Sequence, residues 1–215
     1  SQPESFTLPV SSRLRVLRGG KSMSSVATDE STNALLQQKS LPKFDKINAA
    51  DVKPAMDTLL QDLDTNFIGF EQRLEGADAF KYEDVVEELE KIEAPLEYAW
   101  GVVGHLMGVK NSDDLREVHG SVQPEVVKTT SRLSQSLPLF KAVESVRETQ
   151  KEALDEAQAR ILDNYLKGMK LSGVALEGEL KDKFNANLVK LAELSTTFSN
   201  NVLDATNSYK LVITE

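Results

Sequence analysis

Between Asp51 and Asn207, large apolar residues recur at steps of three and four positions, and this spacing constrains the fold more than any other feature. Such a stripe covers one face of an α-helix, because side chains at those steps lie above one another along the helix axis. A half-buried strand would instead alternate at every second residue. The pattern therefore predicts an all-α chain, folded as a multi-helix antiparallel array.

Six helical stripes can be separated along this region. We expect helices over residues 51–76 and 82–109, from Ser112 or Asp113 onward, from Ser136 with Pro138 onward, and over residues 154–169 and 177–207. Ser and Asp are favoured at helix starts because their side-chain oxygens accept hydrogen bonds from free backbone N–H groups. The loop LSGVAL is expected to separate the last two helices.

Prolines and glycines set further expectations for these helices. Asp51 is a plausible N-cap, with Pro54 in the first turn, where its missing N–H costs little, and Gly76 at the C-terminal end. Pro95 is expected to kink the second helix, and Pro124 is a candidate break in the third.

The last residues follow a different pattern. Tyr209 to Thr214 alternates and is rich in β-formers, which predicts a short terminal β-strand. A lone strand leaves its backbone donors and acceptors unpaired. The strand could pair with the start of the chain or with another chain, but the favoured interpretation is that the sequence stops before its partner.

The charge distribution divides the chain into three regions. Residues 1–23 are rich in Ser, with four basic residues against one acid, whereas the whole chain has a net charge of -9. This composition predicts a possible transit peptide, with a solvated basic tail or a translated leader as the alternative. Residues 24–40 are expected to be a linker, and residues 41–215 a helical domain. Met23 is a candidate start of a cytosolic form.

The residue types present exclude several chemistries. The chain has no cysteine, so disulfides, thiolate catalysis and Cys-ligated zinc are excluded. Its acidic balance argues against nucleic-acid partners, and the longest uncharged stretch that looks buried, 98–109, is too short to span a membrane. Its two histidines do not form HExxH: we expect His105 to be partly buried and His119 to lie on the surface. No catalytic, cofactor-binding or metal-binding residue is therefore assigned.

Two further features have structural interpretations. The acidic run EDVVEELEKIE is expected to be a solvated helix face, with Glu87 and Lys91 supporting the helix at i,i+4. Gly101, Gly104 and Gly108 are expected to allow another backbone to pack closely against their helix.

Three segments resemble a known family. They are LPKFDKINAADVKPAMDTLL at 41–60, WGVVGHLMGVKNSDDLREVHGSVQPEVVKTTSRLSQSLPLFKA at 100–142, and LSGVALEGELKDKFNANLVKLAELSTTFSNNVLDATNSYKLVITE at 171–215. They are similar to the N-terminal part of the thimet oligopeptidase and oligopeptidase A family of zinc metallopeptidases. The similarity is collinear and covers roughly residues 41–215.

The resemblance implies an N-terminal lobe of a zincin-like oligopeptidase, in which two largely helical lobes flank a channel that admits short peptides. In that family two histidines of HExxH and a later glutamate hold zinc, and none of these positions exists in this sequence. The chain alone is therefore expected to bind no zinc and to be inactive, with short peptides and the missing catalytic lobe as partners. The leader resembles targeting extensions of plant organellar members, which clear spent targeting peptides; this implies a chloroplast or mitochondrial location, with the cytosol as the alternative.

Two classes of function remain open. The chain is either the channel-wall portion of a zinc metalloendopeptidase or a free-standing helical module that binds peptides or proteins. A truncated portion should expose an apolar face where the catalytic lobe would pack, because large contiguous apolar patches are unusual on monomers.

Overall fold

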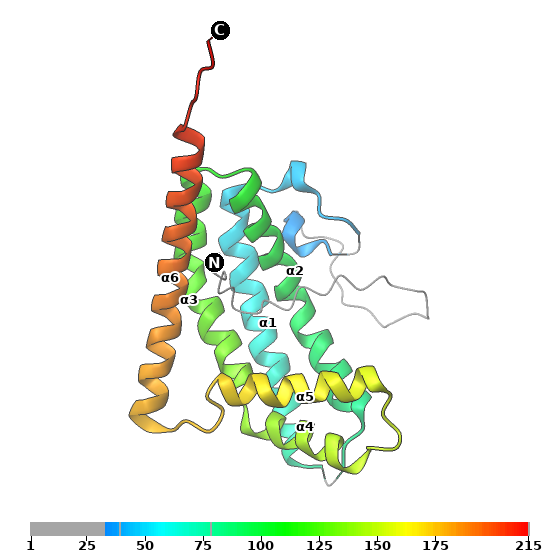
Figure 1. Cartoon of the computed structure of the whole chain (residues 1–215). Helices are drawn as coiled ribbons and strands as arrows, with labels where there is room; N and C mark the ends of the chain where they lie inside the picture. The colour runs from blue at the N-terminus through cyan, green and yellow to red at the C-terminus, as the bar shows by residue number, and fades with distance from the viewer. Residues whose placement is uncertain (1–32, 39, 78, 215) are drawn as a thin grey trace. The chain divides into compact units, whose positions relative to one another are not determined.

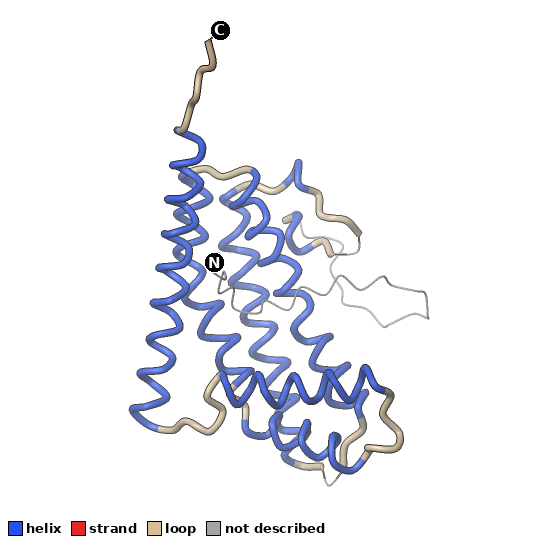
Figure 2. The backbone as a smooth tube through the Cα atoms, in the orientation of Figure 1, coloured by secondary structure: helices blue, strands red, loops and turns tan. Residues whose placement is uncertain are grey.

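The computed structural model describes residues 33–38, 40–77 and 79–214, and residues Ser31–Glu215 form one compact unit. The main elements are six α-helices, shown in Figures 1 and 2: α1 Ala49–Glu75, α2 Glu88–Val109, α3 Asp113–Ser134, α4 Leu137–Thr149, α5 Glu156–Leu171 and α6 Gly178–Ser208. Two 3₁₀ turns, Ala34–Leu36 and Phe44–Lys46, precede α1, and a π-helical turn, Glu83–Glu87, leads into α2. The all-α expectation is therefore confirmed over the described residues.

The predicted terminal strand is not seen. Residues 209–214 carry no regular secondary structure and extend beyond the end of α6 (Figure 2). A strand needs a neighbour to complete its hydrogen-bond ladder, and no strand is present among the described residues to provide one. A β-forming composition alone is thus not sufficient to form a strand at residues 209–214.

The first helix begins earlier than its sequence signals suggested. Asn48 is the N-cap, and Asp51 is the third helical residue, whose carboxylate accepts a hydrogen bond from the Asn48 backbone N–H at 2.9 Å. This capping box satisfies two free donors, whereas an N-cap at Asp51 would satisfy one. Pro54 consequently lies in the second turn, not the first.

The other helix starts and proline positions follow the sequence more closely. Ser112 and Ser136 each cap a helix by accepting a hydrogen bond from a backbone N–H, at 3.2 Å in both cases. α3 continues through Pro124, so the candidate break is absent, and α2 contains Pro95 within a single helix. The Pro95 carbonyl accepts a hydrogen bond from the Gln38 side chain at 2.8 Å.

Part of the segment expected as a linker belongs to the domain. Residues 33–38 are described, and Leu35 is fully buried in the core. Asn33 donates a hydrogen bond to the backbone carbonyl of Asp51 at 2.8 Å, which fastens this segment to the first turn of α1. The predicted basic leader, residues 1–23, lies outside the described residues.

The core is centred on α1, which packs against α2, α3 and α4, while α4 packs against α5 (Figure 1). The buried face of α1 is the stripe seen in the sequence, and it consists of Val52, Met56, Leu59, Leu63, Phe67, Phe70 and Leu74. Burying each such side chain contributes about 1.5–3 kcal/mol relative to leaving it exposed. This core holds α1 to α5 together.

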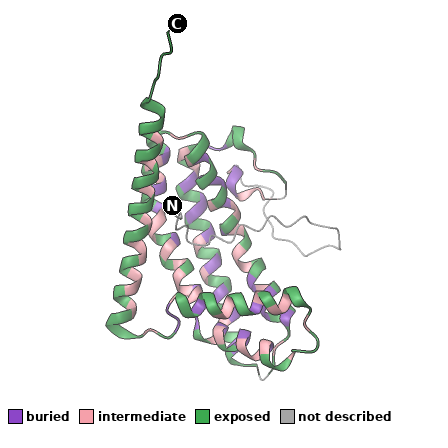
Figure 3. Ribbon diagram, viewed as in Figure 1, coloured by how far each residue is buried: buried purple, intermediate pink, exposed green. Residues whose placement is uncertain are grey.

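α6 differs from the other long helices. It packs along α3, but none of its residues is buried, as its green and pink surface in Figure 3 shows. All buried apolar side chains in the described residues precede it, and the last is Val174 in the α5–α6 loop. That loop reverses the chain at Gly173, whose φ of 82° is unfavourable for any residue with a Cβ.

Candidate functional site

The two histidines occupy the opposite environments from those expected. His119 is buried, whereas His105 is exposed and its ring lies 5.4 Å from the ring of Phe44. The signal was present in the sequence, because His119 lies four residues after Leu115 and three before Val122, on the buried stripe of α3. The expectation failed because histidine was assigned by its polarity and not by its helical position.

His119 is held by stacking and not by hydrogen bonds. Its ring stacks on Trp100 of α2 with centroids 4.6 Å apart, and its buried Nδ1 atom has no hydrogen-bond partner. Burial lowers the pKa of His119 below its usual value, because desolvation disfavours the charged imidazolium. A neutral ring stacked on an indole is a packing element.

The described residues contain no group of three or more His, Cys, Asp or Glu side chains that could hold a metal ion. His105 lies on α2 and His119 on α3, and the two rings contact different aromatic partners. A catalytic zinc site needs three protein ligands converging on one point, commonly two of them histidines. The donors in this part of the chain do not fit zinc.

The acidic run at the start of α2 is not wholly solvated. Glu93 is half-buried, and burial together with the nearby carboxylates of Glu97 and Glu90 raises its pKa to about 8. Burial, with the same carboxylates nearby, also raises the pKa of Tyr165 on α5. The ion pair of Lys91 is made with Glu88 at 3.6 Å, at i,i+3, so the pairing expected with Glu87 is not the one formed.

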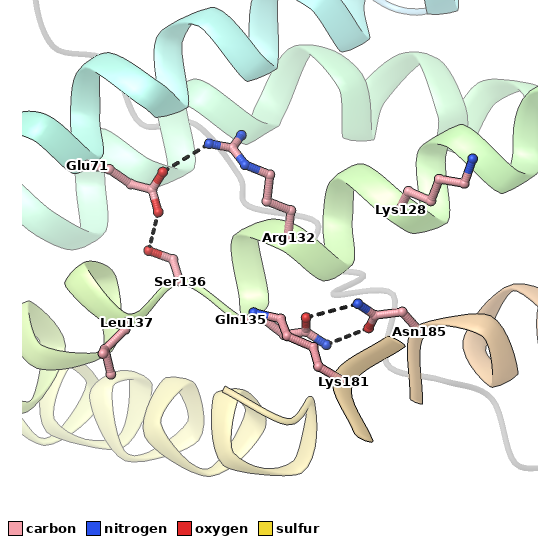
Figure 4. Close-up of a pocket in the computed structure, with 8 residues that line it drawn as sticks. All are labelled: Glu71, Lys128, Arg132, Gln135, Ser136, Leu137, Lys181 and Asn185. Atoms are coloured by element: carbon pink, nitrogen blue, oxygen red, sulfur yellow. Dashed lines mark hydrogen bonds and ion pairs between the residues drawn. The ribbon is translucent and has the colours of Figure 1, made fainter. Parts of the chain in front are cut away.

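A polar cavity of about 390 Å³ lies where α1, the α3–α4 junction and α6 meet (Figure 4). Glu71 accepts hydrogen bonds there from Arg132 at 3.0 Å and from the Ser136 hydroxyl at 2.6 Å. Gln135 and Asn185 exchange two side-chain hydrogen bonds, of 2.7 and 3.3 Å.

These cavity side chains are occupied in holding the helices together. Arg132 also pairs with Asp64 at 2.8 Å, and its guanidinium lies over the ring of Phe67 at 5.3 Å. The Ser136 oxygen accepts the capping hydrogen bond of α4 while its hydroxyl donates to Glu71, and no histidine lines the cavity to activate it. The cavity is a structural junction and not a nucleophilic site.

Most of the exposed large apolar residues of the domain lie on α6 and the segment after it. We call the first group the α6 apolar face; it comprises Leu180, Leu191, Leu194, Phe198 and Val202. We call residues 209–214 the tail; its exposed apolar side chains are Tyr209, Leu211, Val212 and Ile213. A second cavity, of about 400 Å³, is lined by Val202, Ala205, Thr206 and Tyr209, where the face meets the tail.

The side of α6 that meets α3 combines half-buried apolar residues, such as Val189 and Leu203, with polar contacts. Besides the Gln135–Asn185 pair, Gln123 donates to the Thr196 hydroxyl at 2.9 Å, and Arg116 forms a two-point ion pair with Asp204 at 2.8 and 2.5 Å. The bonds of Asn185 and Thr196 are partly buried and contribute about 0.5–1.5 kcal/mol each, whereas the exposed Arg116–Asp204 pair contributes about 0–1 kcal/mol. α6 is thus attached by polar contacts and half-buried apolar residues, while the α6 apolar face is open to solvent.

The glycines of α2 do not receive another backbone within this domain. A Cβ atom built at Gly101, Gly104 or Gly108 meets nothing within 4 Å, and all three positions are exposed. The close packing expected at these residues is therefore absent from the described structure. Among the described residues, no helix combines the length and apolar character that a membrane crossing requires.

Comparison with known proteins identifies relatives of this chain. Residues 56–181 match the family described as Neurolysin/Thimet oligopeptidase, N-terminal domain. Among curated proteins, the chain is 39% identical over 186 residues to "Probable cytosolic oligopeptidase A" and 39% identical over 194 residues to "Organellar oligopeptidase A, chloroplastic/mitochondrial", both of Arabidopsis thaliana. It is 32% identical over 185 residues to "Oligopeptidase A" of Escherichia coli.

These relatives are much longer than the chain. The three matches cover 86%, 89% and 86% of this chain but only 26%, 24% and 27% of the respective relatives. The chain therefore spans about a quarter of the length of the curated proteins that it matches.

Proposed function

The chain belongs to the Neurolysin/Thimet oligopeptidase family, and from this premise we propose that it is the N-terminal, non-catalytic portion of an oligopeptidase that hydrolyses short peptides. The observation that carries the proposal is the α6 apolar face, which lacks a partner within a domain that otherwise buries its apolar stripes. An exposed surface of this kind marks an interaction site on a soluble domain.

In this proposal the zinc of a metallopeptidase is held by residues outside this chain, since the donors described here do not fit it. A bound zinc ion supplies Lewis-acid chemistry and an activated water. This chain contributes none of those groups, and no step of peptide hydrolysis is assigned to its residues. Alone, it is inactive.

The contribution of this domain is steric. The α1–α5 core is a rigid wall, because its helices bury a continuous apolar cluster. A rigid wall beside a catalytic lobe limits the size of peptides that enter and excludes water when the two lobes close. Short peptides are accordingly the substrates, and cleaved targeting peptides are one class of them.

Two cellular locations are compatible with the names of the matched relatives. One matched Arabidopsis protein is named as chloroplastic and mitochondrial and another as cytosolic. We propose an organellar location directed by residues 1–23, with a cytosolic form as the alternative. Fusing residues 1–40 to a fluorescent protein tests this, because a transit peptide directs the fusion into chloroplasts or mitochondria.

Hydrolysis of a quenched fluorescent peptide of about ten residues tests the peptidase proposal. The chain alone, with added zinc, should give no hydrolysis above buffer. The chain co-expressed with the part of the Arabidopsis "Probable cytosolic oligopeptidase A" that follows its match to this chain should hydrolyse the peptide, and a zinc chelator should abolish this. If the native protein proves to be the free domain and binds peptides without cleaving them, the alternative of a non-catalytic interaction module replaces the proposal.

A further inference from the structure

We infer that α6 is shared between two lobes: the side that carries Asn185, Thr196 and Asp204 fastens it to α3, and its apolar face enters the core of a lobe that follows the tail in the polypeptide. This inference rests on the proposed function, because it takes the catalytic lobe as the occupant of the face. It adds which surface of this domain is covered, and by which part of the protein.

The position of α6 relative to the family match is the first argument. The match to the N-terminal domain ends at residue 181, whereas α6 runs from Gly178 to Ser208. Burial divides the structure at nearly the same place, because the last buried apolar residue is Val174. The family match and the buried apolar core thus both end near the start of α6, although α6 belongs to the same compact unit.

The two sides of α6 are geometrically distinct. At about 100° per residue, the five residues of the α6 apolar face lie within an arc of about 80°. Asn185, Thr196 and Asp204, which bond to α3, lie on the opposite half of the helix. A helix with an apolar stripe on the side away from its own domain is one whose core partner is elsewhere.

The exposure of this face is large for the residue types involved. Leu180 is 68% exposed and Phe198 is 70% exposed, whereas Phe67 and Phe70 in the α1 core are almost fully buried. Leucine and phenylalanine are among the side chains most often found inside proteins. The face therefore has the composition of a core but the exposure of a surface.

The tail explains why the occupant is the following lobe and not a separate molecule. The α6 apolar face reaches the cavity at Val202 and Tyr209, where α6 ends and the tail begins, so polypeptide that follows the tail is tethered at that end of the face. A segment tethered by a short connection has a high effective concentration, and closing a short loop costs little entropy. A second copy of the chain has neither advantage.

The tail itself should join that lobe as a strand. Its residues alternate in a β-forming pattern, and Leu211, Val212 and Ile213 are 69–88% exposed. Its backbone can add to a sheet edge through main-chain hydrogen bonds, with alternate side chains entering apolar pockets. The strand predicted from sequence then forms on the partner and not within this domain.

A co-purification experiment with matched variants tests this inference. The 215-residue chain is tagged and co-expressed with the part of the Arabidopsis "Probable cytosolic oligopeptidase A" that follows its match to this chain. The tagged wild-type chain should retain that protein in an amount equal to its own. Leu180→Asp and Phe198→Asp should each lower the retained amount at least tenfold, because each places a charge in the buried seam.

Leu171→Asp is the matched control, since Leu171 is also a leucine and is 71% exposed, but lies at the end of α5. It should bind as the wild type does. Circular dichroism at 222 nm checks that each variant keeps its helices. Asp at position 180 falls in the first turn of α6, where a negative charge favours the helix, so misfolding is not expected from that variant.

Three results would overturn the inference. The first is absence of co-purification with the wild-type chain, and the second is retention by the two α6 variants equal to that of Leu171→Asp. The third is a stable dimer of the isolated chain in sedimentation that Phe198→Asp dissociates, which would make the face a self-association surface. A complex that depends on α6 but hydrolyses no peptide would instead refute the proposed function and leave this inference standing.

Discussion

The separation of the α6 apolar face from the core predicts that the same substitution costs far more stability at one phenylalanine than at another. Phe70 lies on α1 with 1% of its surface exposed, next to Phe67 at a ring distance of 6.1 Å. Phe198 lies on α6 with 70% exposed. Phe70→Ala removes a buried ring and leaves a cavity, whereas Phe198→Ala removes a ring that water already surrounds.

The magnitudes follow from burial. Phe→Ala in a core costs about 3–5 kcal/mol of unfolding free energy, which includes the transfer of the ring and the cavity left behind. A surface substitution away from such features changes the free energy of unfolding by less than about 0.5 kcal/mol. The two variants should therefore differ by at least about 2.5 kcal/mol, although the chemical change is identical.

Urea denaturation followed by fluorescence of Trp100 and by circular dichroism measures this difference. Trp100 is the single tryptophan and packs against the core at its contact with His119, so its emission reports on the α2–α3 interface. Phe70→Leu, with a smaller expected loss, serves if Phe70→Ala is too unstable to purify. A loss above about 2 kcal/mol for Phe198→Ala would show that the face is covered in solution and would refute the reasoning.

Three further predictions concern polar groups. Ser136→Ala removes both the cap of α4 and the hydrogen bond to Glu71, and should lower the free energy of unfolding by about 2 kcal/mol in urea titration. Ser134→Ala, which removes one local bond to the Ser131 carbonyl, is the control and should cost less. The pKa of Glu93 is about 8 in the folded chain and 4.5 in the unfolded chain. Its contribution to stability therefore rises as pH falls from 8 toward 4.5, by up to about 1.4 kcal/mol per pH unit. Glu93→Gln should remove this dependence between pH 8 and pH 5. His119 acts in the opposite sense, because its pKa in the folded chain lies below 6.5. As pH falls below 6.5 the unfolded chain takes up a proton at this residue, so the folded state loses stability. In the Glu93→Gln background, His119→Leu should abolish that loss.

The helices could be predicted because their apolar spacing and their capping residues are visible in the local sequence. Ser112, with Asp113 as the alternative, and Ser136 were predicted as helix starts from their own side chains and the residues that follow, and both serines act as caps. The start of α1 was missed because Asn48 and Asp51 cap it together, and a single-residue criterion selects only one of them. Boundaries set by reciprocal contacts are harder to infer than boundaries set by one side chain.

Features that depend on tertiary packing were predicted less well. The stripe on α6 looked like a core stripe, but α3 meets the opposite half of the helix, where Asn185 and Thr196 lie, and leaves Phe198 exposed. The raised pKa of Glu93 likewise needs burial and neighbouring carboxylates that no local pattern reveals. Exposed apolar side chains were nevertheless expected, from the family resemblance and not from periodicity, and α6 carries several.

The native size of the protein tests whether this domain is one part of a longer peptidase. An antibody against residues 171–215 should capture the protein from cells, and mass spectrometry should give its intact mass. Because the chain spans about a quarter of its curated relatives, the account predicts a polypeptide several times heavier than 23.8 kDa, whose peptide hydrolysis is lost when zinc is chelated. A native polypeptide near 23.8 kDa that hydrolyses no peptide would contradict the account.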